Sequence, residues 1–402
     1  MSEVSNPTAN RRHVLAGVGA VAGVVAVPFV ARAQAPIVMK MGTPTINDNQ
    51  HEWMKMFAAA VEAGSKGAIK AEIYPASQLG AAPRMIEGAQ LGTVQVIVLP
   101  PEFVAGVDSR YEVLGAPGLF KDIAHGQRCL QSPAFNKAFL SIGESKGLKG
   151  VGLFVTAQMI INCRTKLGGV ADVTGKKVRV LGSAMQIEQV KRMKGTGIPM
   201  ALGEVLPALQ QGTIDGILGS LPVITAMRYY DTAKYVLETE HATITVMSAV
   251  SKVWYDKLPK ELQAVIDESA VKASNDIYPW TTDFNDKQRK VWLDNGGEII
   301  ALPKAQRDEL MKLMLPIGGE VAGRKPAEKE LFDLLLKAAE ATAWCQPLTN
   351  LACVRVWCRS ATPCRKPAPF WPPHRLRSSF ASMAPMSWDA TSSPLPSVGR
   401  RS

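Results

Sequence analysis

An arginine within a short strand, Arg179, has the chemistry to bind a carboxylate. It lies in the run Lys176-Lys177-Val178-Arg179-Val180, which is typical of a strand with basic residues at its edge. A guanidinium group is planar, stays protonated at any working pH and can donate two parallel hydrogen bonds to one carboxylate. Spacing alone leaves two roles open, an anion-binding residue in a cleft or an exposed residue beside Lys176 and Lys177, and it favours the exposed one.

The sequence contains no recognisable motif for catalysis or for metal binding. His51, His125 and His241 are scattered, without the spacing of metal ligands. Asp215-Gly216 is typical of a tight turn in which the aspartate bonds nearby backbone. The chain has no G-x-S-x-G, no GxGxxG after a strand and no P-loop. We therefore expect no enzymatic activity, no metal and no cofactor.

The elements that would position Arg179 alternate between strands and helices. A strand–helix–strand–helix–strand pattern fills 37–99 and restarts after about residue 148, which implies βαβ units and mainly parallel sheets. Four helices are expected after the last strand, at 258–275, 280–295, 304–321 and 327–343. We therefore predict a two-lobed α/β protein with a helical C-terminal part. Ligands of such folds bind at the carboxyl ends of strands, between the lobes.

Length and charge agree with this class. The 402 residues suffice for two domains, and 47% are hydrophobic and 20% charged, as in a globular protein. The formal net charge of +11 is concentrated at the ends: residues 1–35 carry +2 and residues 344–402 carry +7, which leaves +2 for residues 36–343. A nearly neutral body gives no electrostatic reason to expect a nucleic-acid partner.

The first 33 residues are typical of an export signal. Arg11 and Arg12 precede an apolar, Ala/Gly-rich run that reaches Val30, and small residues follow. The paired arginines resemble the twin-arginine variant of such signals. We expect cleavage after Ala33 and an exported protein; the alternative is an uncleaved membrane anchor.

The composition breaks near Ala343. Residues 344–402 hold four of the six cysteines and nine prolines but one acidic residue, and no helical or strand period continues there. This bias is typical of a disordered segment or of out-of-frame translation, so we interpret 344–402 as a disordered or frameshifted tail. The two remaining cysteines, Cys129 and Cys163, could form one disulfide in an oxidising compartment.

Several strings, taken in this order, resemble one family. They are AEIYPASQLG (71–80), LGTVQV (91–96), PGLF (117–120), GKKVRV (175–180), IPMALGEVLPALQQGTIDG (198–216) and SKVWYDKLPKELQ (251–263). Together they resemble the solute-binding proteins of TRAP (tripartite ATP-independent periplasmic) transporters, from about Met39 to Ala343. The resemblance implies a type II periplasmic-binding-protein fold whose two lobes are joined by crossing strands and a long helix and close on the ligand.

The resemblance also implies location, partners and lobe boundaries. We expect a periplasmic monomer that captures a small organic acid and delivers it to the small and large membrane subunits of a TRAP transporter. Lobe I is expected at 34–157 plus about 245–290, and lobe II at about 158–244 plus 291–343. The alternatives are an exported sensory receptor and, less favoured, an exported enzyme on a related two-lobed fold.

The arginine in the family's second motif pairs with the ligand carboxylate, and its place here is Arg179. Arg164 resembles a position that the family often fills with arginine; its alternative is an ion pair, for example with Asp172. Gln158 lies on the same strand face as Arg164, because strand side chains alternate with a period of two. Since Gln158 is neutral, a second charge contact is not expected from it.

Further candidates follow from the same resemblance. An asparagine that contacts ligand in the family is replaced here by Gly219, and an aromatic residue after Glu204-Val205 is replaced by Leu206. These replacements predict a roomier, less polar cleft, with space for an aromatic or branched carboxylate. The predicted ligand-binding set is Arg179, Arg164, Gln158, Asn47, Glu102, Phe103, Glu204 and Gly219, in which Asn47, Glu102 and Phe103 lie at loop ends of lobe I and are equally typical of caps or surface residues.

Overall fold

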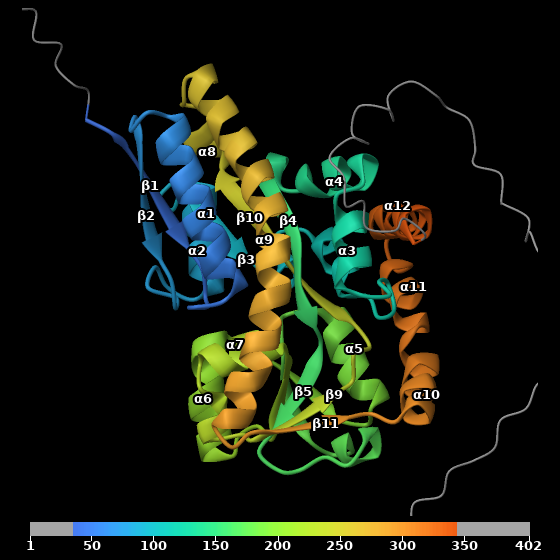
Figure 1. Cartoon of the computed structure of the whole chain (residues 1–402). Helices are drawn as coiled ribbons and strands as arrows, with labels where there is room; N and C mark the ends of the chain where they lie inside the picture. Colours follow the sequence, from blue (N-terminus) through green and yellow to red (C-terminus); the bar gives the residue numbers. More distant parts are fainter. Residues whose placement is uncertain (1–34, 344–402) are drawn as a thin grey trace, which may run out of the picture. The chain divides into compact units, whose positions relative to one another are not determined.

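The computed structural model describes residues 35–343, and these contain two β-sheets with helices around them (Figure 1). The predicted export signal, 1–33, and the predicted tail, 344–402, lie outside the described residues. The first sheet has the order β2-β1-β3-β10-β4 and the second the order β11-β9-β5-β8-β6-β7. We refer to the first sheet with its helices as lobe I and to the second as lobe II.

Each sheet combines parallel and antiparallel strands. In lobe I the strands are β1 (Ile37–Gly42), β2 (Ile69–Tyr74), β3 (Val96–Leu99), β4 (Leu148–Gln158) and β10 (Thr243–Ser251). In lobe II they are β5 (Ile160–Cys163), β6 (Lys177–Val180), β7 (Thr196–Pro199), β8 (Gly216–Gly219), β9 (Tyr235–Glu238) and β11 (Glu298–Ala301). Strand β1 is parallel to β2 and β3, and β6 is parallel to β7 and β8, whereas β10 and β5 are antiparallel to both of their neighbours.

Helices connect the parallel strands, as parallel pairing requires. Lobe I has α1 (Asn49–Gly64) and α2 (Ala82–Leu91), followed by the short 3₁₀ helices η1 (Pro101–Val104) and η2 (Ser109–Gly115) and by α3 (Ile123–Leu130) and α4 (Pro133–Leu140). Lobe II has α5 (Ala184–Arg192), α6 (Leu202–Gln211) and α7 (Leu221–Ala226). The last helices are α8 (Lys252–Tyr255), α9 (Lys260–Asp294), α10 (Lys304–Met314), α11 (Pro316–Ala322) and α12 (Pro326–Thr342).

Helix α1 belongs to the strand–helix pattern predicted for 37–99, and it forms for two physical reasons. The Asp48 carboxylate caps its first turn by accepting a hydrogen bond from the His51 N–H (3.1 Å). The helix then buries one apolar face, on which the Trp53 ring stacks on Phe57 and its Nε1 donates to the Ser274 hydroxyl of α9 (3.1 Å). Strand β3 is buried on both sides: Val96 and Val98 face the α1 and α9 layer, and its other residues face the opposite layer.

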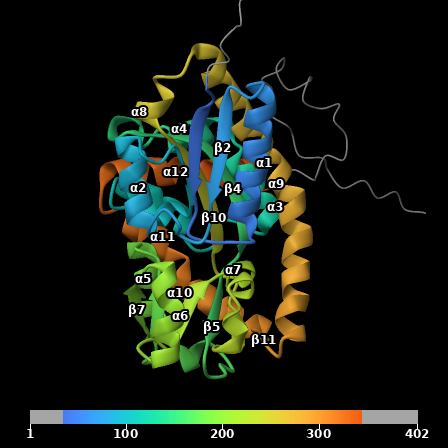
Figure 2. The same cartoon turned by 90° about the vertical axis from the view of Figure 1, so that its left-hand side faces the viewer.

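Two strand crossings and one long helix join the lobes. Chain segments cross between β4 and β5 and between β9 and β10, where the Met159 N–H bonds to the Ala242 carbonyl (2.9 Å). Helix α9 is 35 residues long and packs on α1 and β4 of lobe I and on α7 of lobe II. Figures 1 and 2 both show it passing from α1 to β11.

Two helix predictions were wrong. Separate helices were expected at 258–275 and 280–295, but α9 runs through Pro279 without a break. A proline inside a helix removes one backbone hydrogen bond, and here the packing of α9 on both lobes outweighs that loss. Conversely, the single helix expected at 304–321 is divided at Pro316 into α10 and α11.

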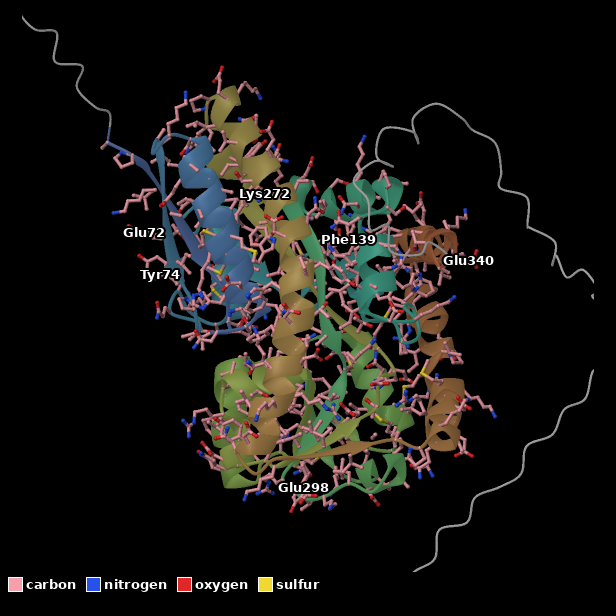
Figure 3. All side chains as sticks on the ribbon, in the orientation of Figure 1. Glu72, Tyr74, Phe139, Lys272, Glu298 and Glu340 are labelled. Carbon is pink, nitrogen blue, oxygen red and sulfur yellow. The ribbon has the colours of Figure 1, made fainter. Side chains whose placement is uncertain are left out.

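Helix α12 packs beside lobe I. It contacts α3, α4 and η2, and Phe139 of α4, labelled in Figure 3, lies edge-on to Tyr111 of η2 with ring centroids 5.5 Å apart. The expected boundary assigned 291–343 to lobe II. On these contacts we propose that residues 326–342 belong with lobe I instead.

Candidate functional site

Arg179 is buried between the two lobes. It lies on β6, opposite Ile217 of β8 and Ile198 of β7, and is 3% exposed. Its Nε donates to the Met200 carbonyl (3.0 Å), while its Nη2 has no hydrogen-bond partner among residues 35–343. Burial lowers the pKa of the guanidinium to about 10, so it stays protonated at neutral pH. Arg179 is therefore not the exposed edge residue that its spacing favoured.

A cavity opens beside this arginine. Both lobes contribute to it, through loop ends and helix starts of lobe I and through β6, β8, α6 and α7 of lobe II. The residues that line it are Pro44, Thr45, Asp48, Asn49, Gln50, Pro100, Phe103, Thr156, Arg179, Leu181, Leu202, Ile217, Leu218, Gly219, Ser220, Val223, Ile224 and Ile244. Its position at the ends of β6 and β8, between the sheets, is the place where α/β folds bind ligands.

The lobe I side of the cavity carries its second charged group, Asp48. The carboxylate is 2% exposed and accepts hydrogen bonds from the Thr45 hydroxyl (2.8 Å) and from Gln50 Nε2 (3.3 Å). Burial raises the pKa of Asp48, against the opposing effect of these hydrogen bonds. Asn49 is held separately, because its Nδ2 donates to the Thr281 hydroxyl of α9 (2.8 Å). The start of α1 thus presents an ordered polar edge to the cavity.

Three of the predicted ligand-binding residues line the cavity: Arg179, Phe103 and Gly219. The other predicted residues do not. Glu204 is exposed on α6, and Asn47 is at φ 54° with its N–H donating to His51 Nδ1 (3.1 Å). The structure therefore brings part of the predicted set together, and a ligand role for these three stays a prediction.

Arg164 and Gln158 are engaged elsewhere. Arg164 lies 3.9 Å from Asp215, not beside Asp172. The Asp215 carboxylate also accepts a hydrogen bond from the Lys177 N–H (2.8 Å), so it holds the start of β6 in place. Gln158 accepts from the Thr243 hydroxyl (3.2 Å) where β4 pairs with β10. Both residues have structural contacts that the sequence did not identify.

Glu102 is buried but does not line the cavity. It is 1% exposed, and its Oε2 has no hydrogen-bond partner in the described part of the chain. Burial, with a smaller contribution from the nearby Glu112, raises the pKa of Glu102 to about 7. A Cβ atom on Gly115 would lie 3.2 Å from its Oε1, so the backbone approaches this carboxyl closely.

Contacts between the lobes surround the site. Glu112, on η2, accepts hydrogen bonds at Oε2 from the Ala184 N–H (2.8 Å) and the Ser183 hydroxyl (3.3 Å), at the start of α5. Gln189 of α5 donates in turn to the Gly115 carbonyl (2.8 Å). Since α5 follows Arg179 and Leu181 directly, these bonds tie the arginine-bearing segment to lobe I.

Sequence reasoning missed most of the polar edge. Asp48, Thr45, Gln50 and Thr156 line the cavity but are not among the predicted ligand-binding residues. The available signal was local: Thr45 and Asp48 follow the end of β1, at the edge where ligands bind in such sheets.

The described residues offer little for metal or disulfide chemistry. Within 35–343 no three His, Cys, Asp or Glu residues are arranged to hold a metal ion. Cys129 and Cys163 are both free and buried, so the possible disulfide between them is not formed. Burial raises the pKa of both thiols to about 12, which disfavours the reactive thiolate.

Comparisons with known proteins agree with this architecture. The family model described as "Bacterial extracellular solute-binding protein, family 7" matches residues 42–324. The 2,3-diketo-L-gulonate-binding periplasmic protein of Escherichia coli K12 is 30% identical over 229 residues, 57% of this chain and 70% of that protein. The C4-dicarboxylate-binding periplasmic protein of Rhodobacter capsulatus is 27% identical over 322 residues, 79% of this chain and 96% of that protein.

Solved structures show the same fold. A TRAP periplasmic solute-binding protein from Desulfovibrio salexigens, with bound orotic acid, superposes with a TM-score of 0.72 at 24% identity, over 76% of this chain and 99% of that one. The predicted family and the predicted two-lobed α/β fold with a helical C-terminal part are thereby confirmed. The chain belongs to family 7 of the bacterial extracellular solute-binding proteins, the family of the TRAP periplasmic solute-binding proteins.

Proposed function

We propose that this chain is the periplasmic receptor of a TRAP-type secondary transporter and captures a small organic acid through Arg179. The observation that supports it is the unpaired Nη2 of a buried guanidinium beside a cavity between the lobes. A buried charge without a partner is unfavourable, and a ligand carboxylate would supply that partner. The Met200 carbonyl holds Nε, so the orientation of the guanidinium is set before the ligand arrives.

Capture of this kind needs closure rather than turnover. A ligand that contacts Arg179 from lobe II and the α1 edge from lobe I favours the state in which the lobes approach each other. Relatives named for binding 2,3-diketo-L-gulonate and C4-dicarboxylates support an organic acid as the ligand class. The proposal therefore assigns no catalytic residue to the site.

The proposed partners and location follow from the family. We propose that the exported chain acts as a monomer and delivers its ligand to the small and large membrane subunits of the transporter, without a nucleic-acid partner. Among the described helices, none is both long and apolar enough to cross a bilayer. The export of the chain by the predicted signal at 1–33 remains part of the proposal.

Replacement of Arg179 tests the proposal. A thermal-shift screen of organic acids, each paired with its neutral amide, identifies a ligand, since a ligand at one hundred times its Kd adds about 2.7 kcal/mol of stability. Arg179→Ala should then weaken binding by about 2–5 kcal/mol, which is at least about thirtyfold in Kd, because one member of a buried charge pair is lost. Arg179→Lys should bind more tightly than Arg179→Ala but less tightly than the parent, since lysine keeps the positive charge but cannot donate two parallel hydrogen bonds to one carboxylate.

The control is Arg84→Ala. Arg84 is exposed on α2, where it pairs loosely with Glu87 at 3.8 Å, so its removal should leave Kd unchanged. The unliganded Arg179→Ala protein should unfold at the same or higher denaturant concentration than the parent, because no paired charge is broken. Equal ligand affinity in the parent and in Arg179→Ala would refute the assignment of the site.

A further inference from the structure

Apolar residues form most of the cavity. Ten of its lining residues are apolar, and six of these come from lobe II, namely Leu181, Leu202, Ile217, Leu218, Val223 and Ile224. Gly219, at the end of β8, adds no side chain to this wall. The cavity volume is about 50 Å³, below the roughly 150 Å³ of an engineered protein cavity that binds benzene, so even a compact ligand requires the lobes to move apart somewhat. The apolar part of a ligand that packs against this wall contributes favourable binding free energy by burying apolar surface. The wall offers that part few hydrogen-bonding groups.

Most of the uncharged polar side chains that line the cavity already have partners within the protein; the exception is Ser220, whose hydroxyl does not cap α7. The Thr45 hydroxyl and the Gln50 amide donate to Asp48, the Thr43 hydroxyl donates to Gln50 Oε1 (3.1 Å), and the Thr156 hydroxyl donates to the Ile244 carbonyl (3.0 Å). Asn49 is bonded to Thr281. A ligand that carries several hydroxyl groups would have to break these bonds or leave its own hydroxyls unpaired, and each buried unpaired group costs about 1–3 kcal/mol.

The charges of the cavity match one carboxylate and not two. Among the described residues that line it, Arg179 is the one cation and Asp48 the one carboxylate. A first ligand carboxylate pairs with Arg179. A second would meet no cation and would share a poorly solvated space with Asp48, and two neighbouring carboxylates cannot both stay ionised at low cost.

Resting on the proposed function, we infer that the ligand is a compact monocarboxylate with an apolar body, branched aliphatic or single-ring, and that Asp48 excludes acids with a second carboxylate. This class differs from the sugar acids and dicarboxylates for which the relatives above are named. Asp48 acts as a specificity-determining residue, and the lobe II wall selects against hydroxylated acids.

Titration calorimetry on the full chain tests both parts of this inference. The probes are 3-methylbutanoate and benzoate as apolar monocarboxylates, succinate as a dicarboxylate, galacturonate as a hydroxylated acid and 3-methylbutanamide as the neutral control. At least one apolar monocarboxylate should bind tenfold more tightly than succinate and galacturonate, and the amide should not bind. Asp48→Asn, which keeps the helix cap, should raise the affinity for succinate relative to that for the monocarboxylate at least fivefold.

A second variant examines the apolar wall. Val223→Thr keeps the side-chain shape but adds a hydroxyl next to the cavity, so the Kd of the apolar acid should rise at least threefold. The matched control is Val253→Thr, because Val253 is exposed on α8 and does not line the cavity.

The outcomes separate this inference from the function on which it rests. Tighter binding of succinate or galacturonate than of either apolar acid, abolished by Arg179→Ala, would refute the inference and leave the proposed function standing. An unchanged ratio of succinate to monocarboxylate affinity in Asp48→Asn would refute the role of Asp48. Acid binding that survives Arg179→Ala would refute the proposed function, and failure of every acid to bind the parent would refute both.

Discussion

The buried carboxyl of Glu102 predicts a specific pH dependence of stability. The perturbation is Glu102→Gln, which keeps the size of the side chain and removes its ionisation. In the folded protein, burial raises the pKa of Glu102 from 4.5 to about 7. At about 1.4 kcal/mol for each tenfold change in proton affinity, this difference corresponds to about 3 kcal/mol of unfolding free energy.

The sign follows from which state holds the proton. Below pH 4.5 Glu102 is protonated in both the folded and the unfolded chain, so it imposes no penalty. As pH rises toward 7, the unfolded chain releases the proton while the folded protein retains it, and stability falls with pH. Above pH 7 both states are ionised and the loss is complete. The parent should therefore lose about 3 kcal/mol relative to Glu102→Gln between pH 4.5 and 8.

Urea unfolding at intervals from pH 4.5 to 8, on the parent and on Glu102→Gln, measures this difference. The amide that the substitution introduces has a constant cost from pH 4.5 to 8, because it does not titrate, so the comparison depends on the change with pH and not on the absolute offset. Parallel stability profiles, within about 0.5 kcal/mol over this range, would show that Glu102 is solvated or paired and would refute the reasoning.

Two further predictions concern contacts near the cleft. Glu112→Ala should lower the unfolding free energy by about 1–2 kcal/mol, because it removes the carboxylate that caps α5 at Ala184. Urea unfolding measures this change, and an effect no larger than that of Glu87→Ala, at an exposed side chain of α2, would contradict it. Burial lowers the pKa of His241 to about 4. Above pH 6.5 the imidazole is neutral in both states and does not affect the unfolding free energy. As pH falls from 6.5 to 4, the unfolded chain binds a proton that the folded protein does not, so the unfolding free energy falls. Relative to His241→Gln, the parent should lose on the order of 3 kcal/mol across that range in urea unfolding, and an unchanged difference would contradict it.

Much of the fold was predictable because the spacing of apolar residues along the chain reflects which face of each element is buried. The alternation at 68–74 and the apolar run at 94–99 correspond to β2 and β3, and the face of Trp53 and Phe57 corresponds to the core side of α1. These patterns repeat every two or every 3.6 residues because one face of each element must be buried. Neither the continuity of α9 through Pro279 nor the division of α10 from α11 at Pro316 was predictable, since a proline ends a helix only where packing does not outweigh its local cost.

The candidate site was predictable in part. Arg179 was identified from its motif, whereas its spacing beside Lys176 and Lys177 favoured an exposed position. Arg164 was placed at the site by resemblance, but it lies beside Asp215. The pattern of a strand shows which side chains share a face of the sheet, but it does not show which neighbouring strand or helix covers a given side chain.

The sequence by itself determined the class of protein: the order of strands and helices, the two-lobed architecture and the arginine with the chemistry to bind a carboxylate. The tertiary structure alone decided which groups share the cavity, because Asp48, Phe103, Arg179 and Ile224 are distant in the chain and meet only when both lobes fold. It also decided the protonation of Glu102, since the pKa of a carboxyl depends on the desolvation produced by segments far away in the sequence.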